Sequence, residues 1–259
     1  MIFETHAHYD DERFEEDRDA LITSMPGRGV GAIINVGASI ESTKTTLALS
    51  EKYPFVYAAV GVHPSDISGL NEETFAWLKE QTKKEKVAAV GEIGLDYYWD
   101  KEPEVQKQQR YWFAEQMKMA REASLPVIIH SRDAAADTME VMKSVHAEEI
   151  PGVIHCYSYS KEMAQEFIRM GYYIGVGGVV TFKNAKKLKE TVESIPLERI
   201  LLETDCPYMA PEPYRGTRND SSNIPYVIAK IAELKGITAE EVEHVTEQNA
   251  RKLFSKVNW

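Results

Sequence analysis

Residues 87–96 read VAAVGEIGLD, a short apolar run that ends in a polar cluster. Val87–Val90 are apolar without alternation, which is typical of a strand buried on both faces of a parallel sheet. Glu92 and Asp96 follow that run directly. Working outward from this segment, the same order of apolar run, polar residues and amphipathic stretch recurs along the chain.

Eight such runs predict the strands of one fold. They are Met1–Phe3, Ala32–Val36, Val56–Val62, Val87–Val90, Pro126–Ile129, Val153–Ile154, Tyr172–Val176 and Ile200–Leu202. The amphipathic stretches between and after them predict helices over 17–28, 40–52, 72–84, 104–124, 134–147, 160–170, 184–194, 223–235 and 239–254. Eight strand–helix units and one extra C-terminal helix predict an α/β fold, the (β/α)8 TIM barrel. An open doubly wound sheet also alternates in this way, but the lack of a glycine-rich first turn favours the barrel.

Length and composition favour a single globular domain. Of 259 residues, 43% are hydrophobic and 27% are charged, which excludes a disordered chain and a disulfide scaffold. Barrels routinely use ~250 residues as one domain. No linker rich in Pro, Gly or Ser divides the chain, so we expect one domain over residues 1–259.

Cysteine content and the N-terminus point to the cytoplasm. Only Cys156 and Cys206 occur, which fits a reducing compartment. The first residues, MIFETHAHYD, lack the basic and apolar segments of a signal peptide. No apolar run approaches the ~20 residues that cross a bilayer. We therefore expect no membrane partner, and nothing in the sequence requires an obligate protein partner.

The charge balance is acidic, with 30 Lys and Arg against 41 Asp and Glu, a net charge of -11. This argues against a protein that coats nucleic acid with a basic face or adheres to anionic membranes. Two divalent cations bound at one site would add a charge of +4 there. The electrostatic field that a phosphate meets is then that of the site with its cations, and not that of the whole chain. The acidity therefore excludes non-specific coating of a duplex, not binding of a strand end.

Polar residues collect where the predicted strands end. Five of the seven histidines do so, and only His146 and His244 do not. Barrel enzymes build their sites from this rim. Side chains at i and i+2 of a strand share a face, so His6 and His8 are expected to converge on the barrel mouth.

Four imidazoles and two carboxylates are then aimed at one place. The candidate ligands are His6, His8, Glu92, His130, His155 and Asp205. This set exceeds what one tetrahedral ion uses and suits two ions ~3.5–4 Å apart that share a carboxylate, with Glu92 as the bridge. Each residue alone has a structural alternative, such as a helix N-cap for Asp205. Glu203 shares the face of Asp205 and is expected to support the ligands and not to bind metal.

Six motifs, in this order and spacing, resemble the TatD family of metal-dependent hydrolases: THAHYD, GVHP, GEIGLDYY, IIHSRDA, VIHCYS and LLETDCPY. The resemblance runs from Thr5 to about Asn219, and NARKLF at 249–254 resembles the family's closing motif. It implies a TIM barrel and a divalent-metal-dependent deoxyribonuclease, often exonucleolytic from the 3′ end. By position, the six candidate ligands match the family's metal ligands. After Asn219 the family usually continues Asn-Glu-Pro, whereas this chain has DSSN at 220–223, which bears on substrate preference.

The expected reaction is hydrolysis of a DNA phosphodiester, at single-stranded or 3′ ends, by water that two divalent cations activate. His6, His8 and Asp205 are expected to hold one ion, and His130 and His155 the other. Asp205 is the candidate proton acceptor, and Glu92 is the candidate bridge. Imidazole suits Zn and Mn while carboxylate suits Mg, so the metal is left open.

Several residues near the strand ends are candidates for substrate binding. They are His63, Arg132 and Arg215, with Arg218, the aromatic residues Tyr97, Tyr98, Trp99 and Tyr157, and the basic stretch Lys183, Lys186, Lys187 and Lys189. The alternative for His63 is a hydrogen bond to a loop, and for Arg132 an ion pair with Asp133. The lysines are more typical of a solvated helix face.

Two rival functions use the same residues. An amidohydrolase-like enzyme acting on an amide, ester or phosphotriester commonly has a carboxylated lysine as the bridge, and here Glu92 stands where that lysine would be. A non-catalytic protein with structural metals would have sites closed by protein ligands. Six ligands for two ions leave positions open for water.

Overall fold

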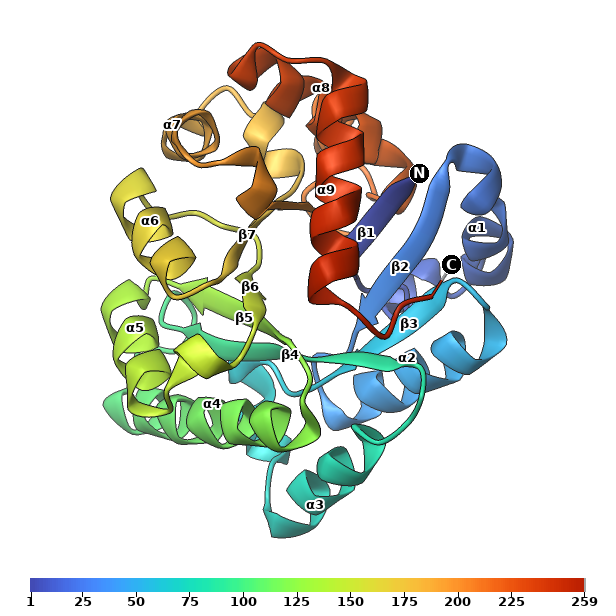
Figure 1. Cartoon of the computed structure of the whole chain (residues 1–259). Coiled ribbons are helices and arrows are strands. Elements are labelled where there is room, and N and C mark those ends of the chain that lie inside the picture. The colour runs from blue at the N-terminus through green and yellow to red at the C-terminus, as the bar shows by residue number, and fades with distance from the viewer. Residues whose placement is uncertain (259) are drawn as a thin grey trace.

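The computed structural model describes residues 1–258 and shows a parallel barrel enclosed by helices (Figure 1). The strands are β1 (Ile2–Ala7), β2 (Val30–Val36), β3 (Val56–Val60), β4 (Val87–Asp96), β5 (Val127–Arg132), β6 (Gly152–Ile154), β7 (Tyr173–Val176) and β8 (Ile200–Leu202). They pair in chain order as one sheet of eight strands. The predicted TIM barrel is confirmed.

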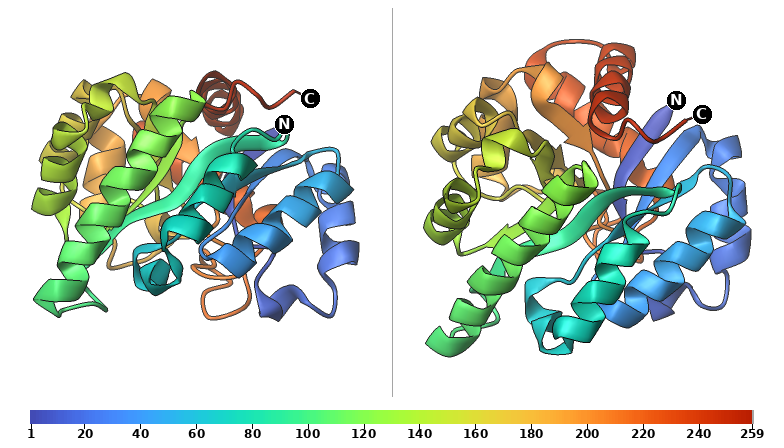
Figure 2. Two further views of the ribbon diagram at one scale, coloured as in Figure 1. Left: turned by 90° about the horizontal axis from the view of Figure 1, so that it is seen from below. Right: turned by 60° about the horizontal axis from the view of Figure 1, so that its bottom comes forward.

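Helices follow the strands and surround the barrel (Figures 1 and 2). They are α1 (Arg18–Ser24), α2 (Ile40–Lys52), α3 (Glu72–Gln81), α4 (Pro103–Ala123), α5 (Ala135–Ser144), α6 (Lys161–Arg169), α7 (Lys186–Ser194), α8 (Ile224–Lys235) and α9 (Ala239–Leu253). The short 3-10 helices are η1 (Glu12–Phe14), η2 (Pro26–Arg28), η3 (Pro64–Gly69), η4 (Ala147–Glu149), η5 (Gly178–Thr181), η6 (Leu197–Arg199) and η7 (Ser221–Asn223). None of the helices within residues 1–258 is long and apolar enough to cross a bilayer.

Three predicted helices end three or four residues early, and the one predicted over 72–84 stops at Gln81. Backbone geometry explains the other two. The helix predicted over 17–28 stops at Ser24, and Pro26 begins a separate 3-10 turn that Gly29 ends at φ 86°. The helix predicted over 134–147 stops at Ser144, and His146 is left-handed at φ 52°. Local backbone geometry ends both helices where the apolar periodicity alone continues.

Three strands run further than predicted. Strand β1, predicted over Met1–Phe3, continues to Ala7. Strand β4 continues to Asp96, and β5 continues to Arg132, so that Asp96 pairs with Arg132 across the two strands. The sequence predicted strand ends at Val90 and Ile129. The difference arises because the backbone ladder continues while the side chains become polar at the barrel mouth. Glu92 and His130 are thus held on strands and not on loops.

The seam between β8 and β1 is closed by a bridge of Ala7 to Cys206 and by a buried carboxylate. Glu4 Oε1 accepts hydrogen bonds from the backbone amides of His6 (3.1 Å) and Thr204 (2.9 Å). Its Oε2 accepts the Thr204 hydroxyl at 2.6 Å. Burial raises the pKa of Glu4 to about 8. This carboxylate therefore ties the segment of His6 to the segment that leads into Asp205.

Helix α9 covers the N-terminal end of the barrel, where both termini lie (Figures 1 and 2). Phe254, which follows α9, is fully buried and packs on Phe3 with ring centroids 5.8 Å apart. Leu253 and Val257 join the same apolar cluster, which includes interior residues of several strands. One end of the barrel is sealed, and the opposite end carries the polar residues.

Candidate metal centre

His6 and His8 converge at the barrel mouth, as their spacing predicted. Their Nε2 atoms lie 3.0 Å apart. The Nδ1 of His8 is 2.9 Å from the Val36 carbonyl, which only accepts hydrogen bonds, so Nδ1 is the donor and Nε2 faces the cluster. An imidazole oriented by a carbonyl in this way is the usual arrangement of a metal-ligating histidine.

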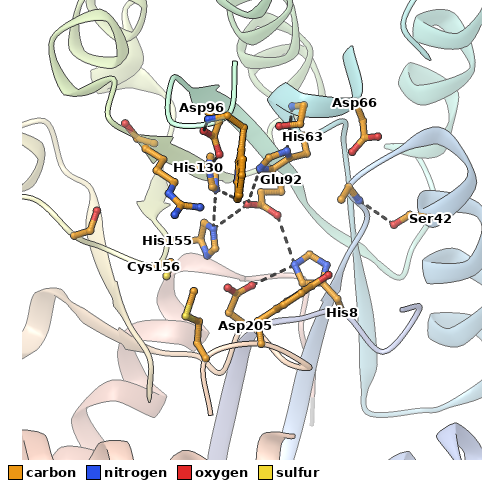
Figure 3. A pocket seen from close by; sticks show the side chains of 18 of the residues that line it. His8, Ser42, His63, Asp66, Glu92, Asp96, His130, His155, Cys156 and Asp205 are labelled. Atoms are coloured by element: carbon orange, nitrogen blue, oxygen red, sulfur yellow. Dashed lines mark hydrogen bonds and ion pairs between the residues drawn. The ribbon is translucent and has the colours of Figure 1, made fainter. Parts of the chain in front are cut away.

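The carboxylate of Glu92 lies between two groups of imidazoles (Figure 3). Its Oε2 is 3.6 Å from His6 Nε2 and 3.5 Å from His8 Nε2. Its Oε1 is 2.8 Å from His130 Nδ1 and 2.9 Å from His155 Nε2. Each oxygen thus faces a different pair of histidines, which is the geometry that a bridging carboxylate needs.

Asp205 follows β8 and lies beside His8 in Figure 3. It completes the group to which His6 also belongs. Its Oδ1 is 3.5 Å from His8 Nε2 and 3.8 Å from His6 Nε2. The residue has φ 57°, in the left-handed region that few residues other than glycine adopt. Its carboxylate faces these imidazoles, which is the arrangement expected of a ligand and not that of a helix N-cap.

Asp96 has a role that the sequence reasoning missed. Its Oδ2 accepts a hydrogen bond from His130 Nε2 at 3.2 Å, so Nδ1 of His130 is the nitrogen that faces Glu92. Its Oδ1 accepts the backbone amides of Tyr98 (3.0 Å) and Trp99 (3.1 Å). One buried carboxylate therefore orients a candidate ligand and the following loop together. The available signal was its place in GEIGLD, four residues after Glu92.

Glu203 lies under the cluster. Its Oε1 accepts the backbone amide of Cys156 at 2.5 Å and is 3.9 Å from His155 Nδ1. Gly175 makes this position possible, because a Cβ there would lie 2.4 Å from Glu203 Oε2. Glu203 thus fixes the backbone beside His155, as expected of a supporting residue, and it also lies within reach of His6 and His155 as a third donor.

The electrostatics of the cluster reflect buried opposite charges. Burial and the neighbouring His155 lower the pKa of His6 to about 3, so His6 stays neutral. Burial also lowers the pKa of His8, but Asp205 and Glu92 outweigh it and raise the pKa to about 10. The pKa of Glu92 is held well below its usual range, against burial, by His155, His63 and His130. A cation bound here competes with the protons of these imidazoles.

His63 also lies at the centre. Its Nδ1 accepts the Ser65 amide at 3.1 Å, so the neutral ring carries its proton on Nε2, which is 3.7 Å from Glu92 Oε1. Burial and the charge of His130 lower the pKa of His63 to about 4 and keep it neutral. The loop hydrogen bond that was the alternative for His63 is therefore present, and its Nε2 faces Glu92.

The predicted substrate-binding arginines lie in different places. Arg132 lines the site, and its guanidinium lies 3.9 Å over the ring of Tyr98, with no ion pair to Asp133 among the described residues. Arg215 lies outside the site, 4.3 Å over Phe182. Arg218 is paired with Asp17 at 2.5 Å, which leaves it unavailable to a phosphate.

The cluster opens into a cavity of about 780 Å³ at the C-terminal ends of the strands. Seven acidic residues and four histidines are among the 23 residues that line it, and Arg132 is the one Lys or Arg among the lining residues that the structure describes. A cavity of this size accommodates a drug-sized molecule or a nucleotide. The donors are therefore accessible from solvent on one side.

The donor set fits divalent cations. His6, His8 and Asp205 have ligand atoms within 4.8 Å of one another, and so do His63, Glu92 and His130. Neutral imidazole and carboxylate are the ligands that Zn, Mn and related ions prefer.

Comparison with known proteins agrees with this geometry. The family model described as TatD related DNase matches residues 3–255. The metal-dependent hydrolase YabD of Bacillus subtilis (strain 168) is 45% identical over 255 residues, covering 98% of this chain and 99% of that protein. The metal-dependent hydrolase YcfH of Escherichia coli (strain K12) is 33% identical, covering 98% of this chain and 96% of that protein.

A solved structure has the same fold throughout. The crystal structure of YJJV, a TatD homologue from Escherichia coli K12, superposes with a TM-score of 0.92 at 34% identity and covers 98% of both chains. The family model and these relatives together span nearly the whole chain. The chain belongs to the TatD family of metal-dependent hydrolases.

Proposed function

We propose that this protein is a divalent-metal-dependent deoxyribonuclease that hydrolyses phosphodiester bonds at single-stranded or 3′ ends of DNA. The observation that carries the proposal is the position of Glu92, with one oxygen toward His6 and His8 and the other toward His130 and His155. Such a bridge suits two ions and the in-line displacement at phosphorus that paired ions assist. The description of the matching family model as TatD related DNase supports the same reaction.

His6, His8 and Asp205 would hold one cation, and His130 and His155 the other, with Glu92 between them. When bound, such ions act as Lewis acids and bring the pKa of water toward ~7. The identity of the ions, among Zn, Mn and Mg, is an outcome of the experiment below. The chain supplies the remaining groups.

Asp205 is placed to accept the proton of the attacking water, because its carboxylate faces His8 and also lines the cavity. His63 donates its Nε2 proton toward the same space and is placed to hold a phosphate oxygen. Arg132 offers a cationic contact for phosphate. All three act on a substrate that enters from the cavity.

The location of the activity follows from the cysteines. Cys156 and Cys206 are both free thiols. Because free thiols persist in reducing compartments, we place the enzyme in the cytoplasm.

The test compares three substrates: 3′-labelled single-stranded DNA, an aryl ester and a phosphotriester, each with Mg²⁺, Mn²⁺ or Zn²⁺ and with chelator. The proposal expects cleavage of DNA alone, lost with chelator and in His6→Ala and Glu92→Gln. Glu122→Gln, on the exposed outer side of α4, is the matched control and keeps full activity. Cleavage of the ester or phosphotriester without DNA would replace the proposal by the amidohydrolase-like alternative.

A further inference from the structure

The loop after β4 places an exposed aromatic ring at the edge of the cavity. Trp99 is 67% exposed and lines the cavity. Its neighbour Tyr98 packs edge-on against it, with ring centroids 4.7 Å apart. A large apolar ring left open beside a polar site is a candidate for ligand contact.

The other aromatic residues at the mouth are already engaged. The hydroxyl of Tyr97 donates to Asp137 at 2.7 Å, and its ring packs against the core. Tyr157 is buried and donates its hydroxyl to the Ser160 carbonyl at 2.6 Å. Tyr98 carries the guanidinium of Arg132 on its ring. Among these four, Trp99 is the most exposed, at 67% against 44% for Tyr98.

Arg132 is next to this ring and is held ready for an anion. Its guanidinium lies 3.9 Å from the Tyr98 centroid and 5.7 Å from the Trp99 centroid. Stacking fixes the side chain without neutralising it. Elsewhere the lining of the mouth carries Asp10, Asp11, Asp66 and Asp100, which repel phosphate. Arg132 is therefore the position at the rim where a second phosphate is attracted.

Asp96 couples this pair to the candidate metal ligands. One of its oxygens accepts His130 Nε2, and the other accepts the amides of Tyr98 and Trp99. The backbone of Trp99 is thus held at a set position relative to the groups around Glu92. A substrate that spans both places would have a base on one side and a phosphate at the cluster.

We propose that Trp99 and Arg132 form a nucleotide subsite, in which Trp99 stacks the base of the terminal nucleotide and Arg132 binds an adjacent phosphate. This proposal rests on the proposed nuclease function. A base within a duplex is stacked on its neighbours, so the subsite selects strand ends whose last base is unpaired. The site is then specific for a base-bearing end, while the reaction itself takes place on the phosphate.

The experiment compares single-stranded oligonucleotides that differ in one residue. One series ends in a normal nucleotide, and the other carries a tetrahydrofuran abasic residue at that end, with both 5′ and 3′ versions. Stacking of one base makes kcat/KM about tenfold higher or more for the normal end in the wild-type enzyme. Trp99→Ala brings this ratio to about one, and Trp99→Phe restores most of it.

Two variants of Arg132 and one control separate the contribution of the guanidinium from that of the Trp99 ring. Arg132→Gln lowers kcat/KM for both series by a similar factor, while Arg132→Lys, which keeps the charge, loses less. Tyr111→Ala, an exposed aromatic change on α4 away from the mouth, leaves both series unchanged.

Two results would overturn the subsite while the nuclease proposal stands. In one, Trp99→Ala leaves the ratio of kcat/KM for normal and abasic ends unchanged. In the other, the wild-type enzyme cleaves both series equally well. Absence of DNA cleavage by wild-type protein with every metal overturns the proposed function and the subsite together.

Discussion

The two ends of the barrel are built from opposite kinds of side chain. At the N-terminal end Phe3, Leu253 and Phe254 bury apolar surface under α9, a favourable contribution to folding. At the C-terminal end the barrel buries Glu92 and His155 beside Glu203, and burying such charges opposes folding unless they are compensated. The difference indicates that the sealed end stabilises the fold, whereas the mouth gives up stability to keep ligands in place.

The largest expected effect is at the mouth. Glu92→Gln removes the charge that both histidine pairs face, and we expect hydrolytic activity to fall by about a thousandfold. The free energy of unfolding without metal is expected to fall, because the imidazoles of His130 and His155 lose the carboxylate with which they pair. Steady-state kinetics and urea denaturation of the same preparation measure the two. A variant that loses activity only because it unfolds would break the contrast between the two ends.

At the sealed end, Phe254→Ala leaves a cavity against Phe3 and is expected to lower the free energy of unfolding by about 3–5 kcal/mol. The folded fraction keeps its kcat/KM and its metal affinity. Urea denaturation measures the change. The control is the surface variant Tyr111→Ala, which is expected to change the free energy of unfolding by less than about 0.5 kcal/mol. Loss of metal affinity in Phe254→Ala would show that the two ends are coupled.

Metal removal tests whether the cluster around Glu92 binds a cation in the folded protein. A divalent ion at about 100 times its Kd is expected to raise the free energy of unfolding by about 2.7 kcal/mol. Thermal denaturation with Mn²⁺ and with chelator measures this difference. His8→Ala is expected to abolish this stabilisation by metal, whereas Phe254→Ala is expected to retain it. A melting temperature indifferent to Mg²⁺, Mn²⁺ and Zn²⁺ contradicts the metal centre.

The smallest effect concerns Asp96, which orients His130 without facing Glu92 itself. Loss of such a partner commonly weakens metal affinity about 10- to 100-fold, and we expect this of Asp96→Ala. Calorimetric titration with Mn²⁺ measures it. Asp100→Ala removes a neighbouring carboxylate that also lines the cavity but has no bond to His130, so its affinity is expected to change less. Equal losses in both variants would assign the effect to charge and not to orientation.

Much of the fold could be predicted because the relevant signals are local. Apolar runs and amphipathic stretches follow from the side-chain periods of strands and helices, and they located all eight strands. The predicted C-terminal ends of β4 and β5 were wrong because the hydrogen bonds between strand backbones continue whether the side chains are apolar or polar. The early end of the helix at Ser24 depends on Pro26 and on the left-handed Gly29, which apolar periodicity does not register.

For the site, residue types and strand-end positions identified the donors, but not their orientation. The proton positions of His8 and His63 depend on Val36 and on Ser65, partners that the fold supplies. Arg218 was a candidate for phosphate binding because it is basic and near β8, yet Asp17, from a distant segment, neutralises it. Pairings of this kind depend on contacts between elements and not on sequence spacing.

By itself, the sequence determined the barrel through its pattern of apolar runs, and it indicated the family through six motifs that resemble TatD proteins. It also predicted six candidate donors from the polar residues at the strand ends. The tertiary structure decided what those donors face. Only folding brings the two oxygens of Glu92 between separate pairs of histidines, and only folding makes Asp96 the link between His130 and the loop of Trp99. The physical reason is that hydrogen bonds and burial depend on distances across strands, which sequence spacing does not specify.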